Sequence, residues 1–245
     1  MISTNQNIIK MFSPELYKWI RNTKRKFSFK LSFKENQWKD CLSQCKTNEE
    51  VFKLAQKIIP AAQIQEEILA LITFLNKEKP SSFLEIGLSS GGTHFLIRYL
   101  CPSIQKSIGI DIDLQNTHII DTLTTTYYHY YIEGRSDKDK TINTVKSWLK
   151  YNSLDVLFID GDHSYEGVKN DFELYRHFVR DGGIIVFHDI VPDHQQKWGK
   201  NTDKYSGGVP LFFKEVSEKY TFHKFINEPN QDGFGIGLII YRSEQ

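Results

Sequence analysis

The sequence has few cysteines, little net charge and no long apolar run, and each shortage excludes a class of protein. Its 245 residues contain three cysteines, Cys41, Cys45 and Cys101, without metal-site spacing, so we expect no disulfide framework and a cytoplasmic location. A formal net charge of +1 gives no general attraction to nucleic acid, and no nucleic-acid partner is expected. No stretch approaches the roughly 18 apolar residues of a transmembrane helix, and the N-terminus lacks a secretory signal pattern. We therefore expect a soluble protein.

One segment departs from this even distribution of charge. Seven basic residues between Arg21 and Lys39 are interleaved with aromatic residues such as Phe27 and Trp38. Such a mixture can favour an anionic membrane surface or an acidic ligand. The alternative is a lid or an arm that joins copies in a homo-oligomer. Because residues 1–46 show no clear hydrophobic period, we treat them as an N-terminal extension, helical in parts, ahead of a domain over residues 47–245.

Strand and helix patterns alternate through that domain. We expect helices near 66–77, after Gly92, and near 114–125, 137–151, 168–179 and 209–220, the fifth of them stopping at Gly182-Gly183. Buried strands are expected at 82–86, 107–111, 128–133, 155–160 and 184–187, followed by a closing hairpin near 221–226 and 235–241. This alternation predicts an α/β fold with a doubly wound, mostly parallel, seven-stranded sheet. Ligands of such sheets bind at the carboxyl ends of the strands.

The stretch FLEIGLSSGG at residues 83–92 predicts a strand, a tight turn and a helix start. Gly87 and Gly91 let the backbone turn and let a ligand approach the helix amides, and we expect Glu85 and Ser89 to contact that ligand as well. The spacing differs from the Gly-x-Gly-x-x-Gly of dinucleotide sites, which disfavours NAD. A ligand with a cationic end and no phosphate, such as S-adenosylmethionine, suits a turn that carries a carboxylate. A purely structural corner is the alternative.

Two further positions complete the expected cofactor site. Asp111 ends the second strand, 24 residues after Gly87, where an acid can accept hydrogen bonds from ribose hydroxyls. An ordinary surface carboxylate is the alternative. After the third strand, Gly134-Arg135-Ser136-Asp137 would border the adenine, with Ser136 or a backbone group contacting its edge.

A second group of polar residues follows the fourth and fifth strands. IDGDHSYEG at 159–167 and FHD at 187–189 would place Asp160, Asp162, His163, His188 and Asp189 around one cleft. Carboxylates with an imidazole suit Mg²⁺ or another divalent cation, and we expect Asp160, Asp189 and His188 as ligands. We expect His163 to be the general base, since its usual pKa lies near neutrality.

Each role in this group has an alternative. His188 could instead be a hydrogen-bonded core residue. His163 could be a metal ligand or could hydrogen-bond to another site residue. Asp162 would either orient His163 or face solvent.

The motifs ExGxxxG, GIDID, FIDGDHSYEGVKND and VFHDI occur in an order and spacing that resembles class I S-adenosylmethionine-dependent methyltransferases. More narrowly, the chain is similar to the group with metal-dependent sugar O-methyltransferases and proteins related to cephalosporin hydroxylase. The resemblance covers about residues 50–240. It implies a Rossmann-like fold, cofactor and metal contacts for Asp160, a metal-binding pair at His188-Asp189, and a base at His163. Position 188 departs from the usual Asp or Glu.

The resemblance implies methyl transfer from S-adenosylmethionine to a hydroxyl group of a small molecule or glycan, sugar-like or phenolic, assisted by a divalent metal. Acceptor specificity is expected in the loop over 190–208, where His194, Trp198 and Tyr205 could contact a ring or serve the structure alone. A nucleic-acid methyltransferase is disfavoured by the charge and by the absence of an Asn-Pro-Pro-aromatic motif. The sequence also leaves open a non-catalytic cofactor-binding partner of a biosynthetic enzyme and an NAD-dependent oxidoreductase.

Overall fold

The computed structural model describes residues 35–125, 128–150, 153–193 and 206–243. The chain divides into two compact units, Met1–Gln44 and Cys45–Gln245. In the first unit the described part is helix α3 (Glu35–Gln44), so most of the predicted N-terminal extension lies outside the described residues. The same holds for His194, Trp198 and Tyr205 of the predicted acceptor loop.

The second unit is built on one seven-stranded sheet with the order β3-β2-β1-β4-β5-β7-β6. Its strands are β1 (Ser82–Ile86), β2 (Lys106–Asp111), β3 (Tyr128–Glu133), β4 (Leu154–Ile159), β5 (Val179–His188), β6 (Thr221–Phe225) and β7 (Ile236–Ile240). The first five run parallel, and β7 is antiparallel to both β5 and β6. The predicted doubly wound sheet and its closing hairpin are confirmed.

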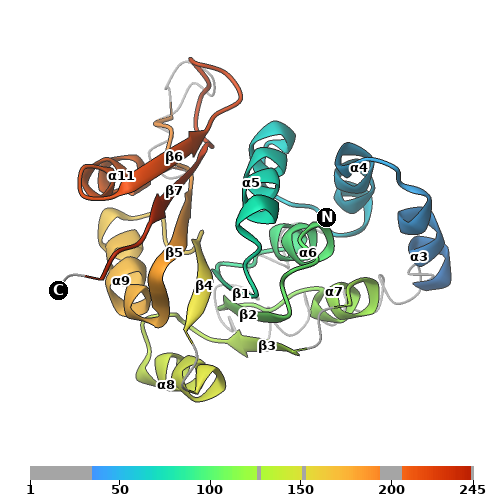
Figure 1. The fold of residues 1–245 in the computed structure, drawn as a ribbon, viewed down its shortest axis with the longest axis horizontal. Coiled ribbons are helices and arrows are strands. Elements are labelled where there is room, and N and C mark those ends of the chain that lie inside the picture. Colours follow the sequence, from blue (N-terminus) through green and yellow to red (C-terminus); the bar gives the residue numbers. More distant parts are fainter. Residues whose placement is uncertain (1–34, 126–127, 151–152, 194–205, 244–245) are drawn as a thin grey trace, which may run out of the picture. The chain divides into compact units, whose positions relative to one another are not determined.

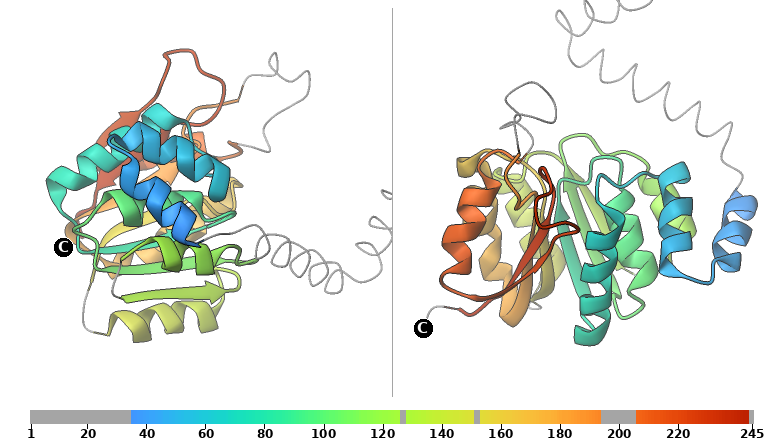
Figure 2. Two further views of the ribbon diagram at one scale, coloured as in Figure 1. Left: turned by 90° about the vertical axis from the view of Figure 1, so that its right-hand side faces the viewer. Right: turned by 90° about the horizontal axis from the view of Figure 1, so that it is seen from above.

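Helices cover both faces of this sheet (Figures 1 and 2). They are α4 (Asn48–Ile58), α5 (Gln65–Glu78), α6 (Gly92–Leu100), α7 (Thr117–Leu123), α8 (Asp139–Leu149), α9 (Tyr165–Tyr175), the 3₁₀ turn η1 (Arg176–Phe178) and α11 (Val209–Ser217). Figure 1 shows α5, α6 and α7 on one face and α8, α9 and α11 on the other. Among the helices of the described segments, none is long and apolar enough to cross a membrane.

The central strands are buried because helices pack on both of their faces. Leu84 in β1, Phe158 in β4 and Phe187 in β5 have no exposed surface. This double burial explains why these strands read as continuous apolar runs in the sequence. Their parallel alignment brings the chain segments after Ile86, Ile159 and His188 to the same edge of the sheet.

The start of the fifth strand differs from the prediction. Gly182-Gly183 does not terminate a helix but lies inside β5, which begins at Val179. The pairing with β4 shifts between Leu154 and Val156, and Gly182 adopts a φ of +70°. The glycine pair therefore forms a bulge in a strand, a second structural use of glycine that local sequence does not separate from helix termination.

Candidate active site

The turn after β1 depends on Gly87, which brings the ends of β1 and β4 together. Its φ is +90°, and a Cβ at this position would lie 2.0 Å from the carbonyl oxygen of Asp160. The Gly87 amide donates to the carbonyl of Ile110 in β2, at 2.8 Å. A side chain at position 87 would therefore force apart the strand ends that form the site.

The start of α6 lies against the segment between α4 and α5. Gly91 is the N-cap residue of α6, with a φ of +91° and no side-chain cap. A Cβ on Gly92 would lie 2.3 Å from the amide nitrogen of Ala61. The first amides of a helix have no partner within the helix, so this end can donate hydrogen bonds to a ligand.

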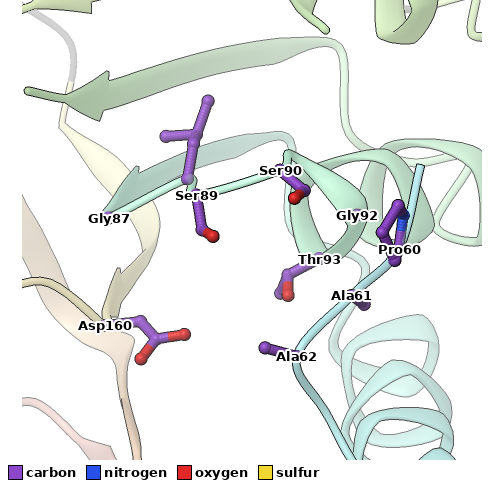
Figure 3. A pocket seen from close by; sticks show the side chains of 10 residues that line it. Pro60, Ala61, Ala62, Gly87, Ser89, Ser90, Gly92, Thr93 and Asp160 are labelled. Atoms are coloured by element: carbon purple, nitrogen blue, oxygen red, sulfur yellow. The ribbon is translucent and has the colours of Figure 1, made fainter. Parts of the chain in front are cut away.

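A pocket opens between this turn and Asp160. It is lined by Pro60, Ala61, Ala62, Gly87, Leu88, Ser89, Ser90, Gly92, Thr93 and Asp160. Figure 3 shows Asp160 on one side and Ala61 and Ala62 on the other. Sequence reasoning found Gly87, Ser89 and Asp160 but missed the segment 60–62. The sequence holds one signal for this segment, Pro60, because a proline interrupts a helix and so marks the break between α4 and α5.

Asp111 lies at the end of β2 beside the same turn. One carboxylate oxygen accepts from the amide of Ser89 at 2.8 Å, and the other accepts from the amide of Asp113 at 2.7 Å. A carboxylate oxygen can accept from more than one donor. The role of Asp111 as a ribose contact remains a prediction, with a geometry that suits it. The next side chain, Ile112, is 64% exposed and was not predicted to take part in the site.

Glu85 is buried beneath the turn and does not line the pocket. Its Oε2 lies 2.9 Å from Nδ1 of His94, a buried residue of α6. Burial raises the pKa of Glu85 well above its usual range, and nearby Asp160 adds to this effect. Burial also lowers the pKa of His94 well below its usual range. The pair is therefore a neutral hydrogen bond under the turn, and the predicted cofactor contact of Glu85 remains a prediction.

Ser136 is held by two residues of α9. Its hydroxyl donates to Oδ1 of Asp171 at 2.5 Å, and its carbonyl accepts from the Tyr175 hydroxyl at 2.8 Å. The hydroxyl hydrogen of Ser136 is thus already used. Burial raises the pKa of Asp171 to about 6. Contact of Ser136 with an adenine remains a prediction.

We expect Asp171→Asn to stabilise the protein at neutral pH. The pKa of Asp171 in the fold, about 6, exceeds its ordinary value of 3.8, so folding favours the proton. The protonated carboxyl therefore adds to the free energy of unfolding below about pH 4. This contribution, up to about 3 kcal/mol, is lost as the pH rises through 6. Asparagine keeps an acceptor for Ser136 without that cost.

Urea unfolding from pH 4 to pH 8 measures this effect. Asp171→Asn should flatten the decline between pH 4 and 6, whereas Asp139→Asn, which changes an exposed carboxylate in the first turn of α8, should not. Parallel curves for Asp171→Asn and the wild type would contradict the prediction.

Three polar residues beyond β4 and β5 form a compact cluster. Asp160, His163 and Asp189 offer ligand atoms within 4.8 Å of one another, a candidate metal group within the described segments. Nε2 of His163 lies 3.2 Å from Oδ1 of Asp160, and Nδ1 lies 3.3 Å from Oδ2 of Asp189. Asp189 holds a left-handed backbone, with a φ of +61°. Non-glycine residues in this conformation occur preferentially at functional sites.

His188 adjoins the cluster from the buried side. Its Nδ1 lies 3.2 Å from Oδ1 of Asp160 and 3.4 Å from Oδ2 of Asp189. Burial alone would lower the pKa of His188, but the two carboxylates raise it to about 10. Burial would likewise raise the pKa of Asp160, but the positive charge of His188 and hydrogen bonds from both histidines lower it to about 2.

Asp162 does not belong to this cluster. Its side chain is exposed, and Oδ1 accepts from the amide of Ser164, the N-cap residue of α9. Of the five residues expected around one cleft, the structure thus assembles four. His163 forms the compact cluster with the two aspartates. His188, which was predicted as a ligand, contacts the same aspartates from the buried interior.

This sheet order, with its antiparallel last hairpin and its glycine turn after β1, is the fold of class I S-adenosylmethionine-dependent methyltransferases. Residues 84–190 match a family model described as a methyltransferase domain. This span contains the turn, Asp111 and the polar cluster. This region is therefore similar to a methyltransferase domain, and the fold around it is the Rossmann-like methyltransferase fold. The narrower similarity to sugar O-methyltransferases remains a prediction.

Similar proteins include an uncharacterized protein, R132, of Acanthamoeba polyphaga mimivirus. It is 36% identical over 155 residues, a match that covers 59% of this chain and 65% of that protein. The chain thus spans just under two thirds of this relative.

Among solved structures, an O-methyltransferase from Bacillus cereus shares 16% identity with a TM-score of 0.55, covering 84% of this chain and all (100%) of that one. TomG from Streptomyces achromogenes shares 13% identity with a TM-score of 0.56, covering 86% and 100%. At these identities the two structures support the fold alone.

Proposed function

We propose that this chain transfers a methyl group from S-adenosylmethionine to a hydroxyl group of a small molecule or glycan, assisted by a divalent cation. The proposal rests on the position of Asp160. It lines the pocket of the glycine turn, while its Oδ1 contacts His163 and His188. A ligand in that pocket would therefore lie directly beside a group suited to proton transfer and cation binding.

The cofactor would occupy the pocket at the turn. The first amides of α6 would bind its amino-acid end, Asp111 would accept from the ribose hydroxyls, and the backbone around Ser136 would border the adenine. Glu85 would support the turn from below. The Bacillus cereus structure contains S-adenosylhomocysteine and the TomG structure S-adenosylmethionine, which supports this class of ligand.

The donor set at the cluster fits a divalent cation. Asp160 and Asp189 supply carboxylates and His188 supplies Nδ1, a combination that suits Mg²⁺ or Mn²⁺. A bound cation would lower the pKa of an acceptor hydroxyl. His188 would have to lose its proton in order to serve as a ligand.

His163 is the residue we assign as general base. Its side chain is 25% exposed, whereas that of His188 is 3% exposed, so an acceptor can reach the former. Both ring nitrogens of His163 contact carboxylates, so one of them would leave its partner to take the hydroxyl proton. The acceptor oxygen attacks the methyl carbon, and the carbon–sulfur bond breaks to leave S-adenosylhomocysteine. The carboxylate that stays in contact then stabilises the charged imidazole. Alignment of oxygen, carbon and sulfur supplies much of the acceleration.

Calorimetric titration of S-adenosylhomocysteine into the full chain tests this proposal. We expect binding in EDTA and in Mg²⁺, no response to NAD⁺, and a rise in melting temperature with Mg²⁺ because the folded site binds the cation and the unfolded chain does not. Failure to bind S-adenosylhomocysteine under both conditions would overturn the proposal. Binding without any metal response would remove the cation from it and leave the cofactor assignment in place.

A further inference from the structure

The loop between β6 and β7 presents an aromatic side chain beside the polar cluster. Phe234 is 37% exposed, and the centroid of its ring lies 6.2 Å from that of His188. The ring is a flat apolar surface without hydrogen-bonding groups. It lies against the buried histidine that contacts both Asp160 and Asp189.

The backbone of Phe234 is in a conformation that large side chains seldom adopt. Its φ is +59°, between Gly233 at +72° and Gly235 at +84°. A bulky residue in the left-handed region is an outlier. Surrounding contacts must maintain such a conformation, and outliers of this kind cluster at functional sites.

Those contacts are present on both sides of Phe234. Its carbonyl accepts from the amide of Val191 at 2.9 Å, which ties the loop to the segment after β5. The amide of Gly235 donates to Oε2 of Glu67 at 2.9 Å. Glu67 lies on α5 and is 1% exposed, and its Oε1 accepts from Nε2 of Gln231 at 2.7 Å. The loop backbone that carries the exposed ring is therefore held by a buried carboxylate and by backbone hydrogen bonding.

We propose that Phe234 positions the acceptor by packing against an aryl ring that carries the reacting hydroxyl. The inference rests on the proposed function and deepens it. An aryl acceptor stacked on Phe234 would bury its apolar face there and direct its hydroxyl groups toward His163. Glu67 is a positioning residue that keeps the loop in place.

Two probes that differ only in their ring test this inference. Catechol and cis-1,2-cyclohexanediol both carry adjacent hydroxyls, and each is titrated into the full chain with S-adenosylhomocysteine and Mg²⁺. We expect wild-type protein to bind catechol about tenfold more tightly than the diol. Phe234→Ala should lose this preference, and its KM for catechol should rise about tenfold while S-adenosylhomocysteine binds as in the wild type. Phe222→Ala, which removes a 44% exposed ring on β6, should behave as the wild type.

The variant Phe234→Asn separates the ring from its backbone. Asparagine tolerates a positive φ, so this variant should keep the loop and still lose the preference for catechol. Retention of the preference in either Phe234 variant would overturn the inference, as would equal binding or no binding of the two probes to the wild type. Normal binding of S-adenosylhomocysteine in those cases would leave the proposed function intact. Its absence from the wild type would overturn both.

Discussion

Changing Asp160 to asparagine is expected to lower the rate of methyl transfer at saturating cofactor by at least about 100-fold, the scale seen when one preorganised electrostatic group is removed. Its Oδ1 is the atom that His163 and His188 share, each at 3.2 Å. Asparagine fills nearly the same volume but removes the negative charge. Protonated His163 then loses a negatively charged partner, and a bound cation would lose an anionic ligand.

Product formation and metal-dependent melting of the same variant test this expectation. Asp160→Asn should abolish the rise in melting temperature with Mg²⁺. Asp162→Asn is the matched control, because its exposed side chain caps the Ser164 amide and keeps an acceptor after the change. A rate within threefold of the wild type for Asp160→Asn, with the metal response unchanged, would remove Asp160 from the mechanism.

The strands of this fold could be predicted because each leaves a simple pattern. Strands β1 and β4 are buried on both faces and read as apolar runs, and the prediction for β1 matches Ser82–Ile86 residue for residue. The prediction was wrong at the start of β5, where Gly182-Gly183 makes a bulge. A bulge depends on pairing with Leu154 and Val156 of another strand. Local sequence carries no record of that pairing.

In the candidate site, too, some residues could be predicted from the sequence and others could not. Acids that end strands, such as Asp111 and Asp160, could be placed because parallel strands share one ligand-binding edge. Contacts between distant segments could not be placed. Nε2 of Gln63 donates to Oδ2 of Asp160 across 97 positions in the chain, and Phe234 reaches His188 from the last hairpin. Glu85 was placed at the right strand end, but its buried partner His94 comes from a helix whose interior face the sequence did not reveal.

Gly87→Ala is expected to destabilise the protein by roughly 2–6 kcal/mol, the sum of backbone strain and overpacking. The added methyl group would meet the Asp160 carbonyl, at 2.0 Å, and the backbone φ is +90°. Both obstacles involve main-chain atoms, which cannot move aside as a flexible side chain could. Any variant that does fold must separate the ends of β1 and β4, so we also expect a loss of affinity for S-adenosylhomocysteine.

Urea unfolding of Gly87→Ala beside Gly134→Ala separates this effect from a general cost of losing glycine. A Cβ on Gly134 would meet Thr141 Oγ1 at an ordinary 3.4 Å, so this control should unfold within about 0.5 kcal/mol of the wild type. Equal stability of the two variants would show that the strand ends can move apart without cost. Because Gly87 and Asp160 line the same pocket, that result would also remove the reason to expect weaker binding of S-adenosylhomocysteine by Gly87→Ala.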